Sequence, residues 1–134
     1  MMQRPIIHVA AAIIVDDDGR TLVVRKRGTT AFMQPGGKID PCETALEALR
    51  RELLEELAVT VSPSDVRALG QHIAEAANEP GHVVKAELFS VRLRDQPRPA
   101  AEIEEIAWID PANPAGLELA PLTAHTVLGL LQRP

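Results

Sequence analysis

The chain has 134 residues and a formal net charge of −5. This length fits a single domain, 1–134, that buries its own core. The acidic balance argues against a binder of nucleic acid polymers, which usually carries a basic face, although a metal ion can bring positive charge to a phosphorylated substrate. The single cysteine, Cys42, excludes an intrachain disulfide and favours a reducing compartment, so we expect a cytoplasmic protein.

The N-terminal part of the chain predicts a strand, a turn and a second strand. Residues 6–15 are rich in Ile, Val and Ala, which indicates a buried strand and is too short to cross a bilayer. A turn at 16–19 and a strand at 21–25 complete a predicted hairpin. Its end is basic, which is typical either of a solvated strand end or of phosphate contacts, and comprises Arg25, Lys26 and Arg27.

A helix is predicted from Thr44 onward. Thr44 and Glu47 have the spacing of a capping box, and Glu47 also stands four residues before Arg51, a favourable ion-pair spacing. One apolar stripe follows at helical spacing: Leu46, Leu49, Leu53 and Leu57. Pro63 marks the break after this helix.

The rest of the chain reads as alternating strands and loops with a closing helix. Strands are predicted at 66–77, 82–93 and 103–109, with loops at 77–81, 95–99 and 111–116 and a helix at 122–131. In the first of these loops, Asn78 and Glu79 are candidates to face a pocket.

Three glutamates lie on one side of the predicted helix near its end: Glu52, Glu55 and Glu56. At ~100° per residue they fall within one arc of about 100°. Like charges at this spacing repel, and the negative end of the helix dipole disfavours them further. They are either solvated or paired with nearby arginines, or they hold a hard cation such as Mg²⁺. Spacing alone leaves both interpretations open.

Two glycines precede the helix. Gly36 and Gly37 either form an ordinary tight turn or allow a ligand to approach the backbone closely. In the second case the carbonyl of Gly37 is an additional oxygen ligand.

Turn and helix together resemble the box of the Nudix hydrolases, G-x5-E-x7-R-E-U-x-E-E-x-G-U, where U is bulky and apolar. The matching positions are Gly37, Glu43, Arg51, Glu52, Leu53, Glu55, Glu56 and Val59. Ala58 stands where the family has glycine, at a helix end that glycine can close in a left-handed conformation. Keeping that conformation with alanine costs ~1 kcal/mol and should not affect activity. Cys42 fills an undefined position, and we expect it to be a tolerated loop residue.

The resemblance implies a fold and a set of roles. The fold is α/β (α+β in some schemes), an α/β/α sandwich with a mixed sheet between the box helix and the C-terminal helix. Glu43 and Arg51 would tie the loop to the helix, and Glu52 would also assist deprotonation of the attacking water. The implied ligands of Mg²⁺, or of Mn²⁺ in its place, are Gly37, Glu52, Glu55 and Glu56.

The family hydrolyses a nucleoside diphosphate linked to another group. The resemblance therefore implies a metal-dependent pyrophosphohydrolase acting on a small nucleotide, such as a damaged nucleoside triphosphate. An ADP-ribose or dinucleotide pyrophosphatase is an alternative, and so is a non-catalytic nucleotide sensor. Such sensors usually lose a box carboxylate, and none is missing here. For this architecture we expect a homodimer.

Substrate contacts are expected outside the box. Arg25 and Arg27 are candidates for the phosphates, and Phe32 is either a pocket wall or a core residue. Relatives often add one acidic residue from outside the box. We favour Glu102 for this role because it lies in a predicted loop, with Glu105 second.

Overall fold

The computed structural model describes residues 4–114 and 116–132, so Ala115 of the predicted loop and the termini of the expected domain lie outside the described residues. The strands are β1 (Ile6–Ile14), β2 (Thr21–Lys26), β3 (Gly36–Lys38), β4 (Val66–Glu75), β5 (Val83–Val91) and β6 (Ile103–Ile109). The helical elements are α1 (Ala45–Leu57), the 3₁₀ turn η1 (Pro63–Asp65), the π-helical turn η2 (Thr123–Val127) and α2 (Leu128–Leu131).

The strands form two sheets. The larger is mixed and has the order β3-β1-β5-β4, with β1 and β5 parallel and the other pairs antiparallel. The smaller pairs β2 with β6. The predicted hairpin is therefore wrong, because β1 and β2 meet only in a single bridge between Val15 and Thr21. β2 is buried on both faces, so it leaves the first sheet and fills the space between two hydrophobic clusters.

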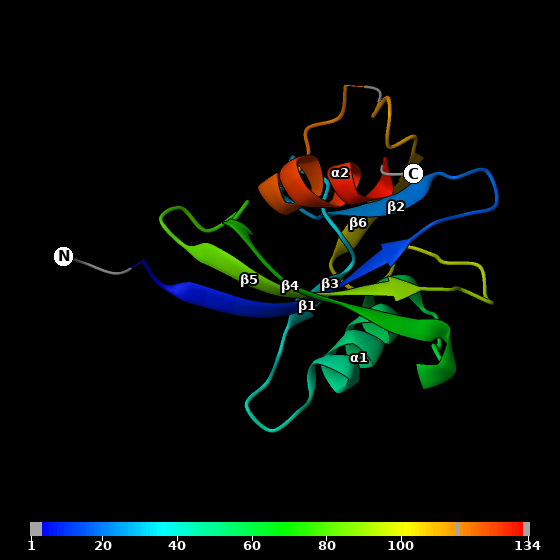
Figure 1. The fold of residues 1–134 in the computed structure, drawn as a ribbon, viewed down its shortest axis with the longest axis horizontal. Coiled ribbons are helices and arrows are strands. Elements are labelled where there is room, and N and C mark those ends of the chain that lie inside the picture. Colours follow the sequence, from blue (N-terminus) through cyan, green and yellow to red (C-terminus); the bar gives the residue numbers. More distant parts are fainter. Residues whose placement is uncertain (1–3, 115, 133–134) are drawn as a thin grey trace.

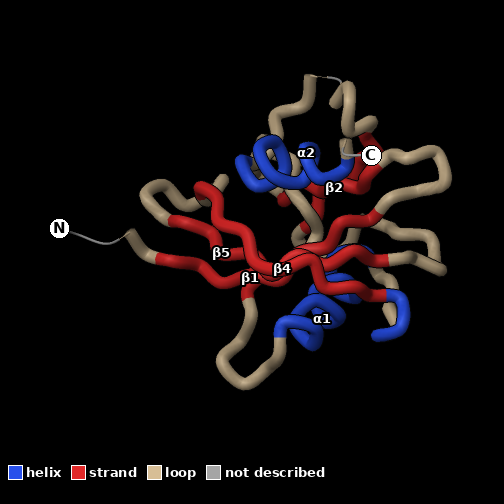
Figure 2. The backbone as a smooth tube through the Cα atoms, viewed as in Figure 1, coloured by secondary structure: helices blue, strands red, loops and turns tan. Residues whose placement is uncertain are grey.

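Helices cover both faces of the larger sheet, α1 on one side and η2–α2 on the other (Figure 1, Figure 2). Alternating side chains of β1 produce the two layers. On one face of β1, Ala10 and Ala12 pack with Leu49 and Leu53 of α1. On the other face, Ala11 and Ile13 pack with Leu122 and Val127 of the C-terminal helix. The predicted α/β/α sandwich with a mixed central sheet is confirmed.

The caps of α1 follow from its sequence. Thr44 and Glu47 form the capping box at its start. The Glu47 carboxylate accepts from the backbone N–H of Thr44, so the predicted ion pair between Glu47 and Arg51 does not form. At the other end Ala58 adopts φ 58° and donates its N–H to the carbonyl of Leu54, which is the left-handed cap that glycine would favour.

The closing helix differs from the regular helix predicted at 122–131. Its first part is the π-helical η2, which continues directly into α2. Within η2, Thr123 is buried and donates its hydroxyl to the side-chain oxygen of Gln34. In the part of the chain that the structure describes, no helix is long and apolar enough to cross a membrane.

Candidate functional site

Strand β3 runs so close to its neighbours that only glycine fits at position 36, and a side chain at position 37 would displace Glu52. A Cβ on Gly36, whose φ is +144°, would lie 2.0 Å from the carbonyl oxygen of Ala10. A Cβ on Gly37 would lie 2.5 Å from the carboxyl carbon of Glu52. The glycine turn therefore places bare backbone directly against the acidic side of α1.

Glu56 is the most deeply buried of the box acids, with 2% of its surface exposed. Burial raises its pKa to about 8; the Gly36 N–H, which donates to Oε1 at 2.9 Å, opposes this shift, and the charge of Glu52 adds to it. No ion pair to Glu56 occurs among residues 4–114 and 116–132. An ionised carboxylate in this position is costly, and a cation beside it would offset that cost.

Arg51 joins the loop to the helix. It donates to Glu52 at 2.6 Å, to Glu43 through Nε at 3.2 Å and to the carbonyl of Lys38 at 3.1 Å. The hydrogen bond from Arg51 to Glu43 is the main cause that lowers the pKa of Glu43. Burial raises the pKa of Glu52, and Arg51 opposes that rise. The arginine therefore fixes the position of Glu52 relative to the glycine turn.

The three box glutamates do not converge. Glu55 is exposed, Glu52 faces Arg51 and Glu56 faces Gly36. In the described part of the chain, no three Asp, Glu, His or Cys side chains stand close enough to hold a metal ion in these rotamers. The assignment of Glu52, Glu55 and Glu56 as metal ligands stays a prediction.

The donors nevertheless fit a hard divalent cation in kind. Glu52 and Glu56 supply only oxygen, which Mg²⁺ prefers, and the charge of Glu52 adds to the rise that burial causes in the pKa of Glu56. The missing Cβ of Gly37 lets the Glu52 carboxylate lie directly against the backbone of the turn. A cation held here would compete with Arg51 for Glu52.

Outside the box, Glu102 rather than Glu105 lies near these acids. Burial is the main cause of the raised pKa of Glu52 and of Glu56, and the charge of Glu102 raises both further. Lys26 approaches Glu102, with 3.5 Å between Nζ and Oε1. Glu105 instead accepts from Arg25 at 2.9 Å. The position of Glu102 matches the expectation from sequence.

Two predicted substrate contacts lie away from the pocket. Phe32 is 6% exposed and belongs to the core, with its ring 6.0 Å from the guanidinium carbon of Arg25. Arg25 also donates to the carbonyl of Thr29. In each case the next residue, Met33 or Lys26, lines the pocket instead. Neighbouring residues of extended chain point in opposite directions, so a choice that is off by one residue selects the wrong face.

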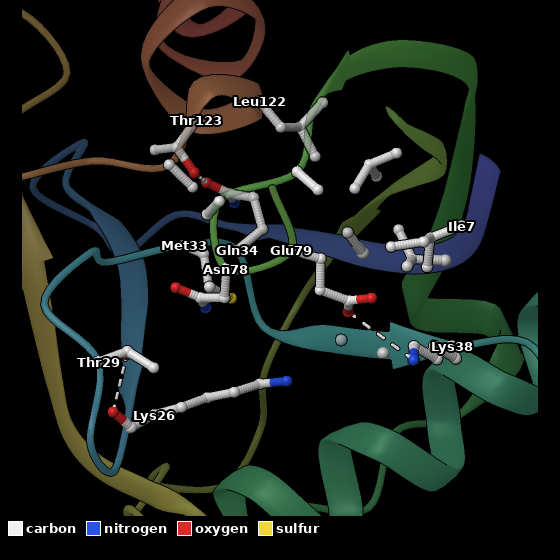
Figure 3. A pocket seen from close by; sticks show the side chains of 18 of the residues that line it. Ile7, Lys26, Thr29, Met33, Gln34, Lys38, Asn78, Glu79, Leu122 and Thr123 are labelled. Carbon is white, nitrogen blue, oxygen red and sulfur yellow. Dashed lines mark hydrogen bonds and ion pairs between the residues drawn. The ribbon is translucent and has the colours of Figure 1, made fainter. Parts of the chain in front are cut away.

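A pocket of about 330 Å³ adjoins the acids (Figure 3). Lys26 and Arg27 line its edge, the latter paired with Glu104 at 3.3 Å. The wall is aliphatic and is formed by Ile7, Val9, Met33, Val84 and Leu122. The sequence did not reveal this wall, because its members come from separate elements and each reads as an ordinary core residue.

Most polar side chains of the pocket are already engaged. Gln34 donates to the carbonyl of Ala12 at 2.8 Å and accepts from Thr123 at 3.0 Å. Lys38 and Glu79 form an ion pair with 3.8 Å between Nζ and Oε1. Asn78 also lines the pocket, and its amide makes no hydrogen bond within the described residues. It therefore has a free donor and a free acceptor for a ligand.

Fold and site together define an α/β/α protein with an acidic helix behind a glycine turn and a pocket beside them. Residues 6–127 match the NUDIX domain family. The chain belongs to this family.

The matches to individual relatives cover smaller parts of the two chains. An RNA pyrophosphohydrolase of Halorhodospira halophila is 48% identical over 43% of this chain and 31% of that protein. The phosphatase NudJ of Escherichia coli K12 is 36% identical over 50% of this chain and 45% of that protein. The chain thus spans less than half the length of these curated relatives. A MutT NUDIX hydrolase from Burkholderia pseudomallei shares the fold, with a TM-score of 0.76, 21% identity and coverage of 96% of this chain and 98% of that chain.

Proposed function

We propose that this protein is a metal-dependent pyrophosphohydrolase of small nucleotides. The observation that carries the proposal is Glu56, a buried carboxylate with no cationic partner among the described residues, beside Glu52 and next to a pocket. Such a carboxylate gains from a divalent cation, and divalent cations commonly bridge carboxylates to substrate phosphates. The relatives named as an RNA pyrophosphohydrolase and a phosphatase support hydrolysis at phosphorus.

The residues proposed to hold Mg²⁺, or Mn²⁺ in its place, are Gly37 through its carbonyl, Glu52, Glu55 and Glu56. The bound ion would polarise the phosphoryl oxygens, offset charge on the leaving phosphate and lower the pKa of bound water. Glu52 is the proposed acceptor of a proton from the attacking water, and Arg51 keeps its carboxylate in place. Glu102 is the proposed additional acid from outside the box.

The pocket orients the substrate. Lys26 lines the pocket, and its side chain extends across the pocket view (Figure 3). Burial raises the pKa of Glu56, and the charge of Lys26 opposes that rise, so Lys26 acts on both the acids and the pocket. We place the phosphates at Lys26 and Arg27 and the nucleoside against the aliphatic wall. The free amide of Asn78 then faces the base. The net charge of −5 favours a small nucleotide over an RNA chain.

A nucleotide screen tests this function. The purified protein is incubated with Mg²⁺ or Mn²⁺ and a panel of nucleoside triphosphates, ADP-ribose, dinucleotides and 5′-triphosphorylated RNA, and release of phosphate, pyrophosphate or nucleoside monophosphate is measured. Turnover of a small nucleotide that disappears on chelation is the expected result. No turnover across the panel would overturn the proposal and favour a nucleotide sensor.

A further inference from the structure

A second hollow lies at the opposite end of the larger sheet. The pocket described above uses Val84 near the start of β5, whereas this hollow of about 370 Å³ uses Ser90 and Arg92 at the end of that strand. Ser64 and Arg67, from η1 and the start of β4, complete its polar lining. In Figure 1 this is the end of the sheet at which η1 leads into β4.

The strand register places its basic residues on one face. Arg67 is the cross-strand partner of Ser90, and Val66 is the partner of Val91. Both valines pack in the cluster formed with α1, so the residues next to them point to the opposite face. Arg67, Ser90 and Arg92 therefore project together, away from α1.

The acid in this hollow is already neutralised. Asp65 accepts from Arg94 at 2.7 and 2.9 Å, and only 7% of its side chain is exposed. The bonds from Arg94 hold the pKa of Asp65 below its usual range, and the charge of Arg92 adds to this effect. The two hydrogen bonds pair the carboxylate with Arg94, and its charge offsets only part of the positive charge that Arg92 and Arg67 bring to the hollow.

Arg67 and Arg92 make no ion pair and no side-chain hydrogen bond among residues 4–114 and 116–132. They are diagonal neighbours on adjacent strands, where like charges repel. In a chain with a net charge of −5, two such arginines around one hollow form a local positive site. An oxyanion between them would remove the repulsion.

We propose that this hollow binds the phosphate group of a small phosphorylated molecule. Guanidinium groups match phosphate oxygens with two parallel hydrogen bonds, and the hydroxyl of Ser90 is a further donor beside them. The hollow is larger than an isolated ion requires, and Val15, exposed to 44%, gives its rim an apolar surface for the organic part of a ligand. The proposal does not depend on the proposed hydrolysis, because the two sites share no residue.

Amide NMR of the metal-free protein tests the site. Inorganic phosphate, pyrophosphate and AMP are titrated separately into ¹⁵N-labelled protein, and shifts are followed at residues 64–67 and 90–92. We expect saturable shifts there, with affinity lowered at least tenfold in Arg67→Gln and in Arg92→Gln, since each loses charge-assisted hydrogen bonds. Both arginines are exposed, so these variants should fold, which thermal melts verify.

Arg98→Gln is the matched control, because it removes an exposed arginine that lies outside the hollow. The proposal is overturned if residues 64–67 and 90–92 do not shift, or if Arg98→Gln weakens binding as much as the other two variants. Tighter binding of AMP than of inorganic phosphate would assign the site to an organic phosphate, and equal affinities would assign it to the phosphate group alone. Shifts near the glycine turn are analysed separately as binding to the candidate active site.

Discussion

The acidic site and the pocket adjoin each other but are assembled in different ways. The acids and the glycine turn come from one continuous stretch, 36–59, in which a capped helix and a three-residue strand fix every group. The pocket is collected from β1, the end of β2, the loop after β4 and the start of the C-terminal helix. Reactive groups are thus concentrated in local sequence, whereas the groups that would select a substrate are dispersed along the chain.

The two regions also differ in electrostatics. At the acidic site a buried carboxylate lacks a cationic partner among the described residues, so removing one charge should have a large effect. In the pocket, Gln34, Thr123, Lys38 and Glu79 satisfy one another, so substitutions there should alter selectivity more than rate. The following experiments test this contrast in order of decreasing effect.

The largest effect is expected for Glu56→Gln. This change keeps an oxygen to accept from the N–H of Gly36 but removes the charge proposed to hold the metal. We expect kcat to fall at least ~100-fold with the fold intact, the scale for losing a key electrostatic group. Mg²⁺-dependent turnover and circular dichroism measure the two properties.

Glu118→Gln is the control for this loss. It removes an exposed carboxylate that accepts from the hydroxyl of Thr30 and is absent from the pocket lining. Its turnover should stay close to that of the unmodified protein. Near-normal Mg²⁺-dependent turnover in Glu56→Gln would exclude that residue as a metal ligand.

A smaller effect, on stability, follows from the raised pKa of Glu56. The unfolded carboxyl releases its proton near pH 4.5, whereas the folded one keeps it until about pH 8. Between these values the folded state binds the extra proton, so the free energy of unfolding of the metal-free protein should fall as pH rises. The loss is on the order of a few kcal/mol and ends above pH 8, where both states are ionised.

Denaturant unfolding in the presence of EDTA between pH 4.5 and 9 measures this dependence. In Glu56→Gln the free energy of unfolding should depend less on pH, and at pH 8 it should exceed that of the unmodified protein. Because a cation displaces the proton, Mg²⁺ should stabilise the unmodified protein more at pH 8 than at pH 6. If the free energy of unfolding depends on pH in the same way in both proteins, Glu56 is not a buried carboxyl that keeps its proton in the folded state.

This contrast also explains how far sequence reasoning could go. The helix was predictable because its cap, its apolar stripe and its glutamates all lie within one continuous segment of the chain. The structure reproduces the cap and buries Leu49, Leu53 and Leu57 of the stripe. Glu102 lies near enough for its charge to act on Glu52 and Glu56, and its role as an additional acid stays a prediction. Local spacing carries this information.

Other features depend on pairing that local spacing does not encode. β2 follows β1 after a short turn, yet it pairs with a strand some 80 residues later because both of its faces need cover. The strand register shifts between Arg25, which does not line the pocket, and Lys26, which does, and spacing along the chain did not indicate this shift. The Glu52 carboxylate accepts from Arg51 and the Glu56 carboxylate accepts from the N–H of Gly36, and the box pattern alone did not reveal these two contacts.

In the pocket, Asn78→Asp should change base preference if the proposed hydrolysis holds. The amide offers one donor and one acceptor, whereas a carboxylate accepts two N–H groups, as the Watson–Crick edge of guanine supplies and that of adenine does not. The added charge should slow both substrates, so the ratio of kcat/KM for GTP over ATP is the informative quantity. We expect it to rise about tenfold.

Asn78→Leu separates this effect from a loss of shape. It has a similar size but no hydrogen-bonding group, so both rates should fall without a gain for GTP. If the GTP/ATP ratio in Asn78→Asp equals that of the unmodified protein, Asn78 does not read the base. Absence of any turnover in the unmodified protein would instead contradict the proposed function itself.

The smallest effect is expected at Ala58, which ends α1 in the left-handed region with φ 58°. An alanine Cβ is strained there and a glycine is not, so Ala58→Gly should raise the free energy of unfolding by ~1 kcal/mol, reduced somewhat by the greater freedom of glycine in the unfolded chain. The residue is exposed, and its N–H to Leu54 bond is kept. Turnover should not change, because no side chain at this position reaches the acids.

Denaturant unfolding measures the stability of Ala58→Gly, and steady-state kinetics on the same preparation measure its turnover. A changed kcat with unchanged stability would mean that the end of α1 influences the acidic site. The cap of the helix and its glutamates could then not be treated as independent.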